Sequence, residues 1–289
     1  MMSVSELALT TFNGLSFAGL LFLVASGFTL IFSLMGVLNL AHGTFYLWGG
    51  YLGLVTLGTT GSWLLALTVG ALGVAIGGGV LERLVYRRVR GKELSEVLLS
   101  VGISLVLADL ALAQFGGDSL TIAPPSWLSG SVALGDLVVP QFRLAVIVAA
   151  LAVMAGLWVL LKRTKVGAII RAGVDDEEML GALGVNVRRV AAVVFVLGAL
   201  LAGASGVVGG VFFGTYPGAD AEMLLFALVV VVVGGLGSLP GAVVGSLVVG
   251  LMYSFGVSLV PDLLYFVLFG PMLLVLVLRP RGILGGRLG

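Results

Sequence analysis

The feature that most constrains this chain is the length of its uncharged apolar runs. From Leu7 to Leu81 there is not one Asp, Glu, Lys or Arg, and residues 190–278 hold only Asp220, Glu222 and Asp262 as charged groups. A helix needs about 20 apolar residues to cross the hydrocarbon layer of a membrane. The 289 residues are 60% hydrophobic and 10% charged. They predict an all-α polytopic membrane protein with about eight to ten transmembrane or half-spanning helices.

Lys and Arg gather in three short segments, and these predict the orientation. The segments are residues 83–92, 162–189 and 279–287, and every Lys and Arg except Arg143 lies in one of them. Because positive side chains collect in cytoplasmic loops, we expect these segments in the cytoplasm and the acidic or neutral loops between them outside. The net charge of +1 averages two faces of opposite sign, so it gives no reason to expect a nucleic-acid partner.

The residue inventory excludes several kinds of chemistry. The chain has no Cys and a single His, His42, which excludes a disulfide framework, a thiol nucleophile and a Cys-based metal site. A phosphate-binding loop ends in Lys followed by Ser or Thr, whereas Lys92, Lys162 and Lys165 precede Glu, Arg and Val. We predict no catalytic residue, no cofactor and no metal site. The chain is not expected to be an enzyme, and any ATP hydrolysis would belong to partner subunits.

Apolar stretches between loops predict the helices. They are expected over Ala8–Met35, Thr44–Leu57, Ser62–Leu81, Val97–Phe115, Leu144–Leu161, Val190–Phe213, Met223–Val233, Ala242–Val257 and Leu263–Leu278. Together they predict one transmembrane domain over residues 1–289, with a cytoplasmic segment at 162–189. The loop Gly116–Phe142, which contains three Pro, is expected to be ordered only by turns.

Two predicted helices, Thr44–Leu57 and Met223–Val233, are shorter than a full crossing. They lie beside the sequences NLAHG and GGLGSLPG. Short or Gly/Pro-interrupted segments in transporters often mark broken helices that line a cavity, but a tilted span would look the same. The residues assigned to a broken helix or to close helix packing are Gly206, Gly210, Gly234, Gly235, Gly237 and Ser238. Gly206 and Gly210 follow Gly198 and Ala202 at spacings of four, which favours internal packing or a subunit contact.

A charged stretch, Arg171–Asn186, reads RAGVDDEEMLGALGVN. Its acidic run, residues 175–178, suits a helix N-terminus, and Gly184 suits the C′ position that ends a helix, with Val185 able to pack back on Leu180. The apolar face of this short helix would consist of Met179, Ala182 and Leu183. Such a helix either docks on a partner or packs on its own membrane domain, and both interpretations stay open.

Three polar residues within or between apolar spans are candidates for a translocation path. Asn39 and His42 could line the path, or they could cap helix ends, with Asn39 as an N-cap for the helix that follows. Asp109 lies well inside a predicted span, where an acid is by default a functional hypothesis. Alternatively, Asp109 reaches interfacial water.

Five motifs in order along nearly the whole chain resemble one family. They are Arg171–Asn186, NLAHG at Asn39–Gly43, LERLVYRRVRG at Leu81–Gly91, GGLGSLPGA at Gly234–Ala242 and RPRGILG at Arg279–Gly285. This set resembles the branched-chain amino acid ABC importer permeases, and most closely the H-type subunit of the high-affinity importers. The chain departs from the family pattern at Glu177 and Glu178, which add acid, and at Thr44, where relatives often carry Glu.

The resemblance implies a type II-like ABC importer permease in a bacterial inner membrane. Its partners would be a second, paralogous permease, two cytoplasmic ATP-binding subunits, an external solute-binding protein and membrane lipid. The resemblance places ATPase coupling on Arg171, Ala172, Asp175, Asp176, Met179, Leu183, Gly184, Val185 and Asn186. The implied function is inward movement of branched-chain or related hydrophobic amino acids.

Other functions remain open at this point. Similar permeases serve urea or short amides. A stand-alone proton-coupled carrier would use Asp109 and His42 as its relay, and it would leave the exposed helix without a role. An intramembrane hydrolase would need a nucleophile beside a base, or paired metal ligands. The sequence has a single His and no HExxH motif, so it does not provide either arrangement.

Overall fold

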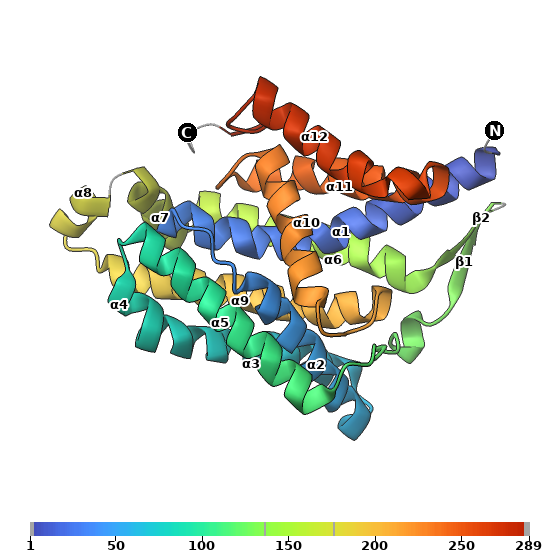
Figure 1. The fold of residues 1–289 in the computed structure, drawn as a ribbon, viewed down its shortest axis with the longest axis horizontal. Helices are drawn as coiled ribbons and strands as arrows, with labels where there is room; N and C mark the ends of the chain where they lie inside the picture. Colours follow the sequence, from blue (N-terminus) through green and yellow to red (C-terminus); the bar gives the residue numbers. More distant parts are fainter. Residues whose placement is uncertain (1–2, 136, 176, 286–289) are drawn as a thin grey trace.

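The computed structural model describes residues 3–135, 137–175 and 177–285. Figure 1 shows a bundle of long helices that run roughly side by side, with one small β-hairpin at one end. The helices are α1 (Val4–Met35), α2 (His42–Thr60), α3 (Trp63–Leu81), α4 (Arg87–Val89), α5 (Glu93–Phe115), α6 (Gln141–Arg163), α7 (Lys165–Asp175), α8 (Glu177–Ala182), α9 (Val187–Phe212), α10 (Ala219–Gly234), α11 (Leu239–Leu259) and α12 (Leu264–Leu278). A π-helical turn, Glu82–Tyr86, joins α3 to α4.

Every helix predicted from the sequence is present, and several begin a turn earlier than predicted. The first turns of these helices hold polar capping residues, which a prediction based on apolar stretches leaves out. Ser3 and Glu6 form a capping box at the start of α1, and the Ser238 hydroxyl accepts the Gly241 N–H at the start of α11. These side chains satisfy N–H groups that have no partner within the helix.

The membrane assignment follows from length and apolarity. Among the described residues, six helical segments are long and apolar enough to cross a membrane: Val4–Met35, Trp63–Val89, Glu93–Phe115, Gln141–Arg163, Val187–Phe212 and Leu239–Leu259. The helices α2, α10 and α12 are not among these six segments, because they are too short or not apolar enough to meet the same criterion. The chain is an all-α polytopic membrane protein in which nearly all regular structure is helical.

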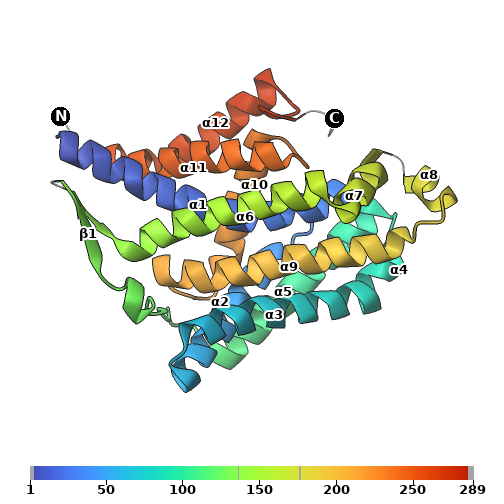
Figure 2. The ribbon, with the colours of Figure 1, turned by 180° about the vertical axis from the view of Figure 1, so that it is seen from behind.

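The central helix is α1. In its most apolar stretch 89% of the residues are buried, compared with 17% in α5 and in α6. Aromatic side chains surround α1: the Phe17 ring meets Phe213 and Phe226 edge-on at centroid distances of 5.5 and 5.4 Å. Therefore α1 is the axis of the fold, whereas α5 and α6 present most of their surface outward, as Figure 2 shows for α6.

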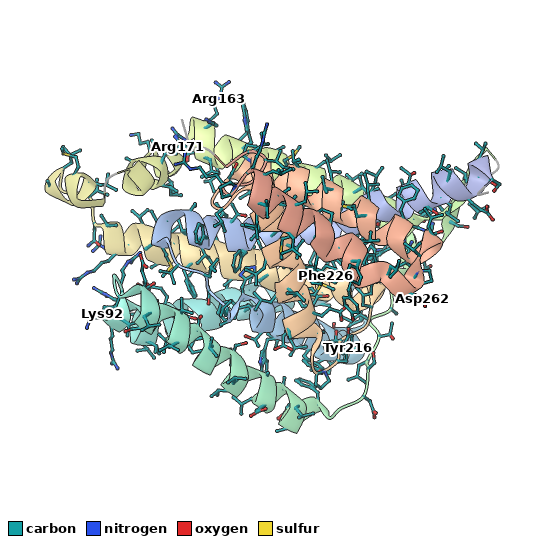
Figure 3. All side chains as sticks on the ribbon, turned by 45° about the horizontal axis from the view of Figure 1, so that its top comes forward. Lys92, Arg163, Arg171, Tyr216, Phe226 and Asp262 are labelled. Carbon is teal, nitrogen blue, oxygen red and sulfur yellow. The ribbon has the colours of Figure 1, made fainter. Side chains whose placement is uncertain are left out.

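The two ends of the bundle differ in charge. The turn around α4, the helices α7 and α8, and the C-terminal segment lie at one end, and the N-terminus and the hairpin lie at the other (Figures 1 and 2). Figure 3 places Lys92, Arg163 and Arg171 toward the first end and Asp262 toward the second. We call the first the basic end; it comprises residues 82–92, 162–189 and 279–285. The segregation of charge matches what is expected of a membrane protein.

The loop between α5 and α6 is more ordered than predicted. It contains a 3-10 turn, Ser126–Leu128, and an antiparallel hairpin of β1 (Ser131–Leu134) and β2 (Leu137–Pro140). The expectation of turns alone is wrong because two apolar anchors were overlooked: Ile122 and Val139 are both fully buried. A bridge between Leu120 and Thr215 also ties this loop to the connection between α9 and α10.

Candidate functional sites

A sharp corner at the basic end connects α6 to α7. The Thr164 hydroxyl donates to the Leu160 carbonyl at 2.6 Å and accepts the Gly167 N–H at 3.1 Å. A Cβ at Gly167 would lie 2.2 Å from the Leu160 carbonyl oxygen. Only glycine allows α7 to lie this close to the end of α6, so a displacement of α7 would be passed directly to a spanning helix.

The prediction of a short helix that ends at Gly184 is confirmed by α8, but the predicted start at Asp175 is not. Arg171, Ala172 and Asp175 belong to α7, Asp175 being its last residue, and Glu177 begins α8. Asp176 lies outside the described residues. The start is wrong because the apolar spacing of residues 165–170 already forms a helix, with Ile170 buried in the core, and this helix continues to Asp175.

Gly184 ends α8 through a paired set of backbone hydrogen bonds. Its φ is +82°, its N–H donates to the Gly181 carbonyl at 3.0 Å, and the Val185 N–H donates to the Leu180 carbonyl at 3.3 Å. This is the Schellman arrangement, in which a left-handed residue caps the last carbonyls of a helix. Asn186 then starts α9, because its side-chain oxygen accepts the Arg189 N–H at 3.1 Å.

The two faces of α8 differ in burial. Leu180 is buried and is one of the side chains nearest to Gly173 of α7. Met179 is 59% exposed and Leu183 is 74% exposed, and Ala182 beside them is also exposed. We call Met179, Ala182 and Leu183 the outer face of α8. The side chains of this face are exposed, and α8 lies at the tip of the basic end (Figure 1).

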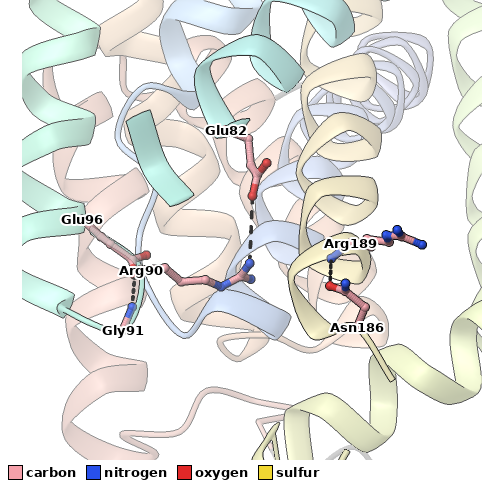
Figure 4. A network of polar contacts seen from close by, with 6 residues as sticks. All are labelled: Glu82, Arg90, Gly91, Glu96, Asn186 and Arg189. Atoms are coloured by element: carbon pink, nitrogen blue, oxygen red, sulfur yellow. Dashed lines mark hydrogen bonds and ion pairs between the residues drawn. The ribbon is translucent and has the colours of Figure 1, made fainter. Parts of the chain in front are cut away.

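Buried carboxylates hold the neighbouring loop at the basic end. Glu82 pairs with Arg90 at 4.0 Å, and Glu96 accepts the Gly91 N–H at 2.7 Å. Both carboxylates are almost inaccessible to solvent. Figure 4 shows this pair of contacts next to the Asn186 cap of α9. The turn between α3 and α5 is therefore a fixed part of this surface.

Asn39 and His42 lie in the interior, where they join helices. The Asn39 side-chain oxygen accepts the Tyr86 hydroxyl at 2.9 Å and the Ala41 N–H at 3.2 Å. The N-cap position of α2 is Ala41, so the interpretation of Asn39 as that N-cap is wrong; Asn39 forms the turn that precedes it. His42 is fully buried, and its Nε2 lies 3.0 Å from the Val24 carbonyl of α1.

The two short helices meet at their N-terminal ends, inside the protein. A Cβ at Gly43 of α2 would lie 2.2 Å from the Asp220 carbonyl of α10, and both Thr44 and Asp220 are buried. Tyr216, just before α10, donates a hydrogen bond to Glu222. Burial, and then the nearby Glu222 carboxylate, raises the pKa of Tyr216 to about 12, so its hydroxyl stays a donor at neutral pH.

The remaining glycine positions lie at helix contacts and turns. Gly206 packs on the Tyr46 carbonyl of α2, and Gly210 packs on Ile122. Gly234 ends α10 against Gly241, where α10 and α11 approach closely. Gly235 and Gly237 have positive φ in the connection between them, and Ser238 caps α11. This connection is a tight turn between two packed helices.

Asp109 is separate from His42. It lies on an exposed face of α5, whereas His42 has no accessible surface, and no described contact joins the two residues. The arrangement gives no support to a proton relay made of this pair. Among the described residues, no group of three His, Asp or Glu side chains could hold a metal ion.

Sequence reasoning missed the partners of Asn39 and its neighbour. Tyr86 donates to Asn39, and the Ser100 hydroxyl accepts the Leu40 N–H at 3.1 Å. These residues are 47 and 60 positions away in the chain, and neither lies in a pattern that indicates the contact. A cavity that contains Arg171 was also missed; no local signal predicts it because four helices contribute to its walls.

Known proteins resemble this chain along most of its length. The profile of a family described as "Branched-chain amino acid transport system / permease component" matches residues 10–276. The high-affinity branched-chain amino acid transport system permease protein BraD of Pseudomonas aeruginosa is 31% identical over 288 residues, which cover 94% of each chain. The permease protein LivH of Escherichia coli, from a system of the same description, is 32% identical over 95% of this chain and 94% of its own.

LivH of Salmonella typhimurium shows the same degree of similarity, 32% over 293 residues. No solved structure matches the chain. With a family profile that spans residues 10–276 and relatives that are similar from end to end, the chain belongs to the permease components of branched-chain amino acid transport systems.

Proposed function

We propose that this chain is the transmembrane permease subunit of an ABC importer that moves branched-chain or related hydrophobic amino acids into the cytoplasm. The proteins it resembles are named for branched-chain amino acid transport, and this supports the choice of solute. A permease component is a transport protein and not an enzyme, so the energy for transport comes from other components. The bacterial inner membrane is the proposed location.

The proposed assembly contains a second, paralogous permease, two cytoplasmic ATP-binding subunits and an external solute-binding protein. Within it, residues 1–289 form one permease domain, and the segment 162–189 is its cytoplasmic coupling part. The observation that carries this proposal is the outer face of α8, with Leu183 at 74% exposure. Exposed apolar surface of this kind is favourably covered by a partner protein.

Coupling would proceed through connected elements. Closure of the ATPases on ATP would displace α8, and Leu180 packs α8 back toward α7. The corner at Thr164 and Gly167 then links α7 to α6. In this mechanism the permease performs no chemistry on the solute; it switches the accessibility of a path between two sides.

The candidates for the path divide according to their burial. Asn39 and His42 are enclosed: Asn39 joins the loop before α2 to the turn after α3, and His42 joins α2 to α1. We therefore assign them a positioning role beside the path. Asp109 lies on an exposed face of a spanning helix. An acid facing lipid is unfavourable, so we propose that this face of α5 borders the path or the second permease.

The test of coupling is co-purification of the chain with its ATP-binding subunits. Leu183→Asp introduces a charge into the outer face of α8, and loss of an apolar anchor of an interface is expected to weaken ATPase retention by about 2 kcal/mol, or roughly 30-fold. Gly184→Trp, at φ +82°, should also release the ATPase. Val4→Asp is the matched control, because Val4 is 85% exposed at the opposite end.

Two results bear on the proposal separately. If both α8 variants reach the membrane and retain the ATPase as wild type does, coupling through α8 is refuted. Uptake by the reconstituted assembly tests the solute: leucine, isoleucine or valine should be accumulated with ATP, and accumulation of urea or a short amide instead would replace the proposed substrate.

A further inference from the structure

A cavity of about 780 Å³ lies between four helices toward the basic end. Its walls come from α1, α6, α7 and the N-terminal part of α11. Because α1 packs against both α6 and α11, it forms the back of the cavity, and α6 and α11 flank it. The transport function proposed above assigns no role to this cavity, and neither Asn39 nor His42 nor Asp109 contributes to it.

The charged groups that the structure describes in the cavity lining are both positive. They are Lys162 and Arg171, and no described lining residue is Asp or Glu. One guanidinium nitrogen of Arg171, Nη1, is buried and has no hydrogen-bond partner in the described part of the chain. The first residues of α11, Leu239 and Pro240, also line the cavity, and they add the partial positive charge of a helix N-terminus. This end of the cavity suits an anion.

A second polar group in the cavity lacks a partner. Thr29 of α1 has 2% of its surface exposed, and its hydroxyl has no hydrogen bond within the described residues. Ser33 and Ser238 also line the cavity. A buried hydroxyl without a partner costs free energy, so a ligand with acceptor oxygens would satisfy both Thr29 and Arg171.

The rest of the wall is apolar and borders the lipid-facing surface. Leu30, Met154 and Val243 represent this part of the lining. The helix α6 is largely exposed, and Trp158, which also lines the cavity, is 51% exposed with the Arg163 guanidinium 5.8 Å from its ring centre. Trp and Arg in this position are typical of the membrane–water interface. Figure 3 labels Arg163 and Arg171 at this end of the bundle.

We propose that this cavity binds an anionic phospholipid from the cytoplasmic leaflet. Its phosphate would lie against Lys162 and Arg171, and an acyl chain would lie along the apolar wall between α6 and α11. Basic pockets between transmembrane helices on the cytoplasmic side are suited to such head groups. A free amino acid fits less well, because the described lining offers no carboxylate for its ammonium group.

The bound lipid would support the coupling segment. Arg171 belongs to α7, whereas Lys162 belongs to α6 and Leu239 to α11, so one phosphate would join three elements. The helix α7 continues toward α8, whose outer face is the proposed ATPase contact. A lipid in the cavity therefore holds α7 in place relative to the membrane helices.

The experiment is native mass spectrometry of the full chain, purified with its co-purifying subunits and titrated with phosphatidylglycerol or phosphatidylcholine. The wild type should retain phosphatidylglycerol in preference to phosphatidylcholine. The double variant Lys162→Gln/Arg171→Gln should bind phosphatidylglycerol roughly tenfold or more weakly, because each basic group contributes to anionic lipid attraction. The control is the double variant Arg83→Gln/Arg88→Gln, which removes the same two charges from exposed residues at the basic end that do not line the cavity, and it should bind as wild type does.

A second pair of variants separates shape from charge. Ala155→Trp fills the cavity from α6 without altering a charge, and it should also displace the lipid; Val148→Trp places the same bulk on an exposed site of α6 away from the cavity and should not. Equal retention by wild type and the Lys162→Gln/Arg171→Gln variant, or equal loss with Arg83→Gln/Arg88→Gln, would overturn the proposal. Displacement of the lipid by leucine, or by inorganic phosphate alone, would overturn it too, by assigning the cavity to the solute path or to a free anion.

This outcome is independent of the proposed transport function, because the quantity measured is bound lipid and not uptake. A chain that imports a different solute, or that couples to its ATPase through another surface, can still bind the lipid. Conversely, failure of lipid retention leaves the ATPase co-purification result unaffected.

Discussion

At the scale of single residues, a glycine is required for stability only where the backbone of another helix comes close to it. Gly206 of α9 lies so close to α2 that a Cβ there would be 1.9 Å from the Tyr46 carbonyl oxygen. Gly77 of α3 has nothing within 4 Å of the equivalent position and is exposed. Both residues belong to spanning helices, so the sequence alone does not distinguish them. The partner helix does, because small residues are required only where two backbones meet.

Gly206→Ala is expected to destabilise the protein by about 1–3 kcal/mol, because α9 and α2 must separate to admit the methyl group. The matched variant Gly77→Ala should be neutral, or stabilising by up to about 1 kcal/mol, because alanine is the better helix former. Thermal unfolding in detergent measures both. Equal effects of the two variants would contradict the close contact between α9 and α2.

Asp109→Leu distinguishes two placements of this carboxylate. If the carboxylate borders the solute path, as proposed above, the variant should lower the uptake rate with little gain in stability. If it faces hydrocarbon, the variant should instead stabilise the chain in lipid by up to about 2.5–3.5 kcal/mol and leave uptake unchanged. Thermal unfolding and uptake are the paired measurements. A more stable variant with unchanged uptake would show that Asp109 has no part in transport.

At the scale of elements, the end of α8 sets how its outer face is presented. Two glycines lie in or just after this helix, and they differ in backbone conformation: Gly184 has φ +82°, whereas Gly181 lies within the helix and has nothing near its Cβ position. The left-handed conformation costs about 1–2 kcal/mol for other residues. The same substitution at the two sites should therefore change the stability of α8 in opposite directions.

Gly184→Ala should weaken the hydrogen bond from the Val185 N–H to the Leu180 carbonyl and speed exchange of that amide by roughly fivefold, which corresponds to about 1 kcal/mol. Gly181→Ala should slow exchange in α8, since alanine favours the helix. Hydrogen exchange measured on the purified chain gives both values. Faster exchange in both variants would mean that Gly184 is not the cap of α8.

Short elements also show where sequence patterns lose information. The apolar stretches of the sequence predicted α2 and α10 as short helices. They gave no indication that the N-terminal ends of these helices meet at Gly43 and Asp220. That contact depends on the packing of α1 and α9 around them, and such packing has no local signature. The predicted helix start at Asp175 is wrong for a related reason: the apolar face of α7 extends that helix to Asp175, beyond the position that charge alone suggests.

At the scale of the whole molecule, apolarity and charge predicted most of the fold. The long uncharged runs specified the spanning helices, and the basic segments specified which loops share one end. What they could not specify is the arrangement of helices around α1, because in a membrane most helices are apolar on every side and periodicity no longer marks the buried face. The cavity and the interior contacts of Asn39 depend on that arrangement.

The absence of Cys in the sequence makes the predicted orientation directly measurable. Single cysteines at Val4, Trp127 and Leu183, which are 85%, 62% and 74% exposed, would report both ends of the bundle. A membrane-impermeant maleimide applied to spheroplasts should label Val4→Cys and Trp127→Cys. Leu183→Cys should be labelled only after the membrane is opened, because basic segments stay in the cytoplasm. The parent chain gives the unlabelled background.

The labelling pattern separates two kinds of error. If Leu183→Cys alone is labelled from outside, the bundle is correct and its orientation is reversed, so α8 could not meet a cytoplasmic ATPase. If Val4→Cys and Trp127→Cys are labelled from opposite sides, the fold itself is contradicted, since the N-terminus and the hairpin lie at the same end (Figures 1 and 2). Only the pattern with both outside and Leu183→Cys inside leaves α8 and the lipid cavity on the cytoplasmic side, where the coupling mechanism requires them.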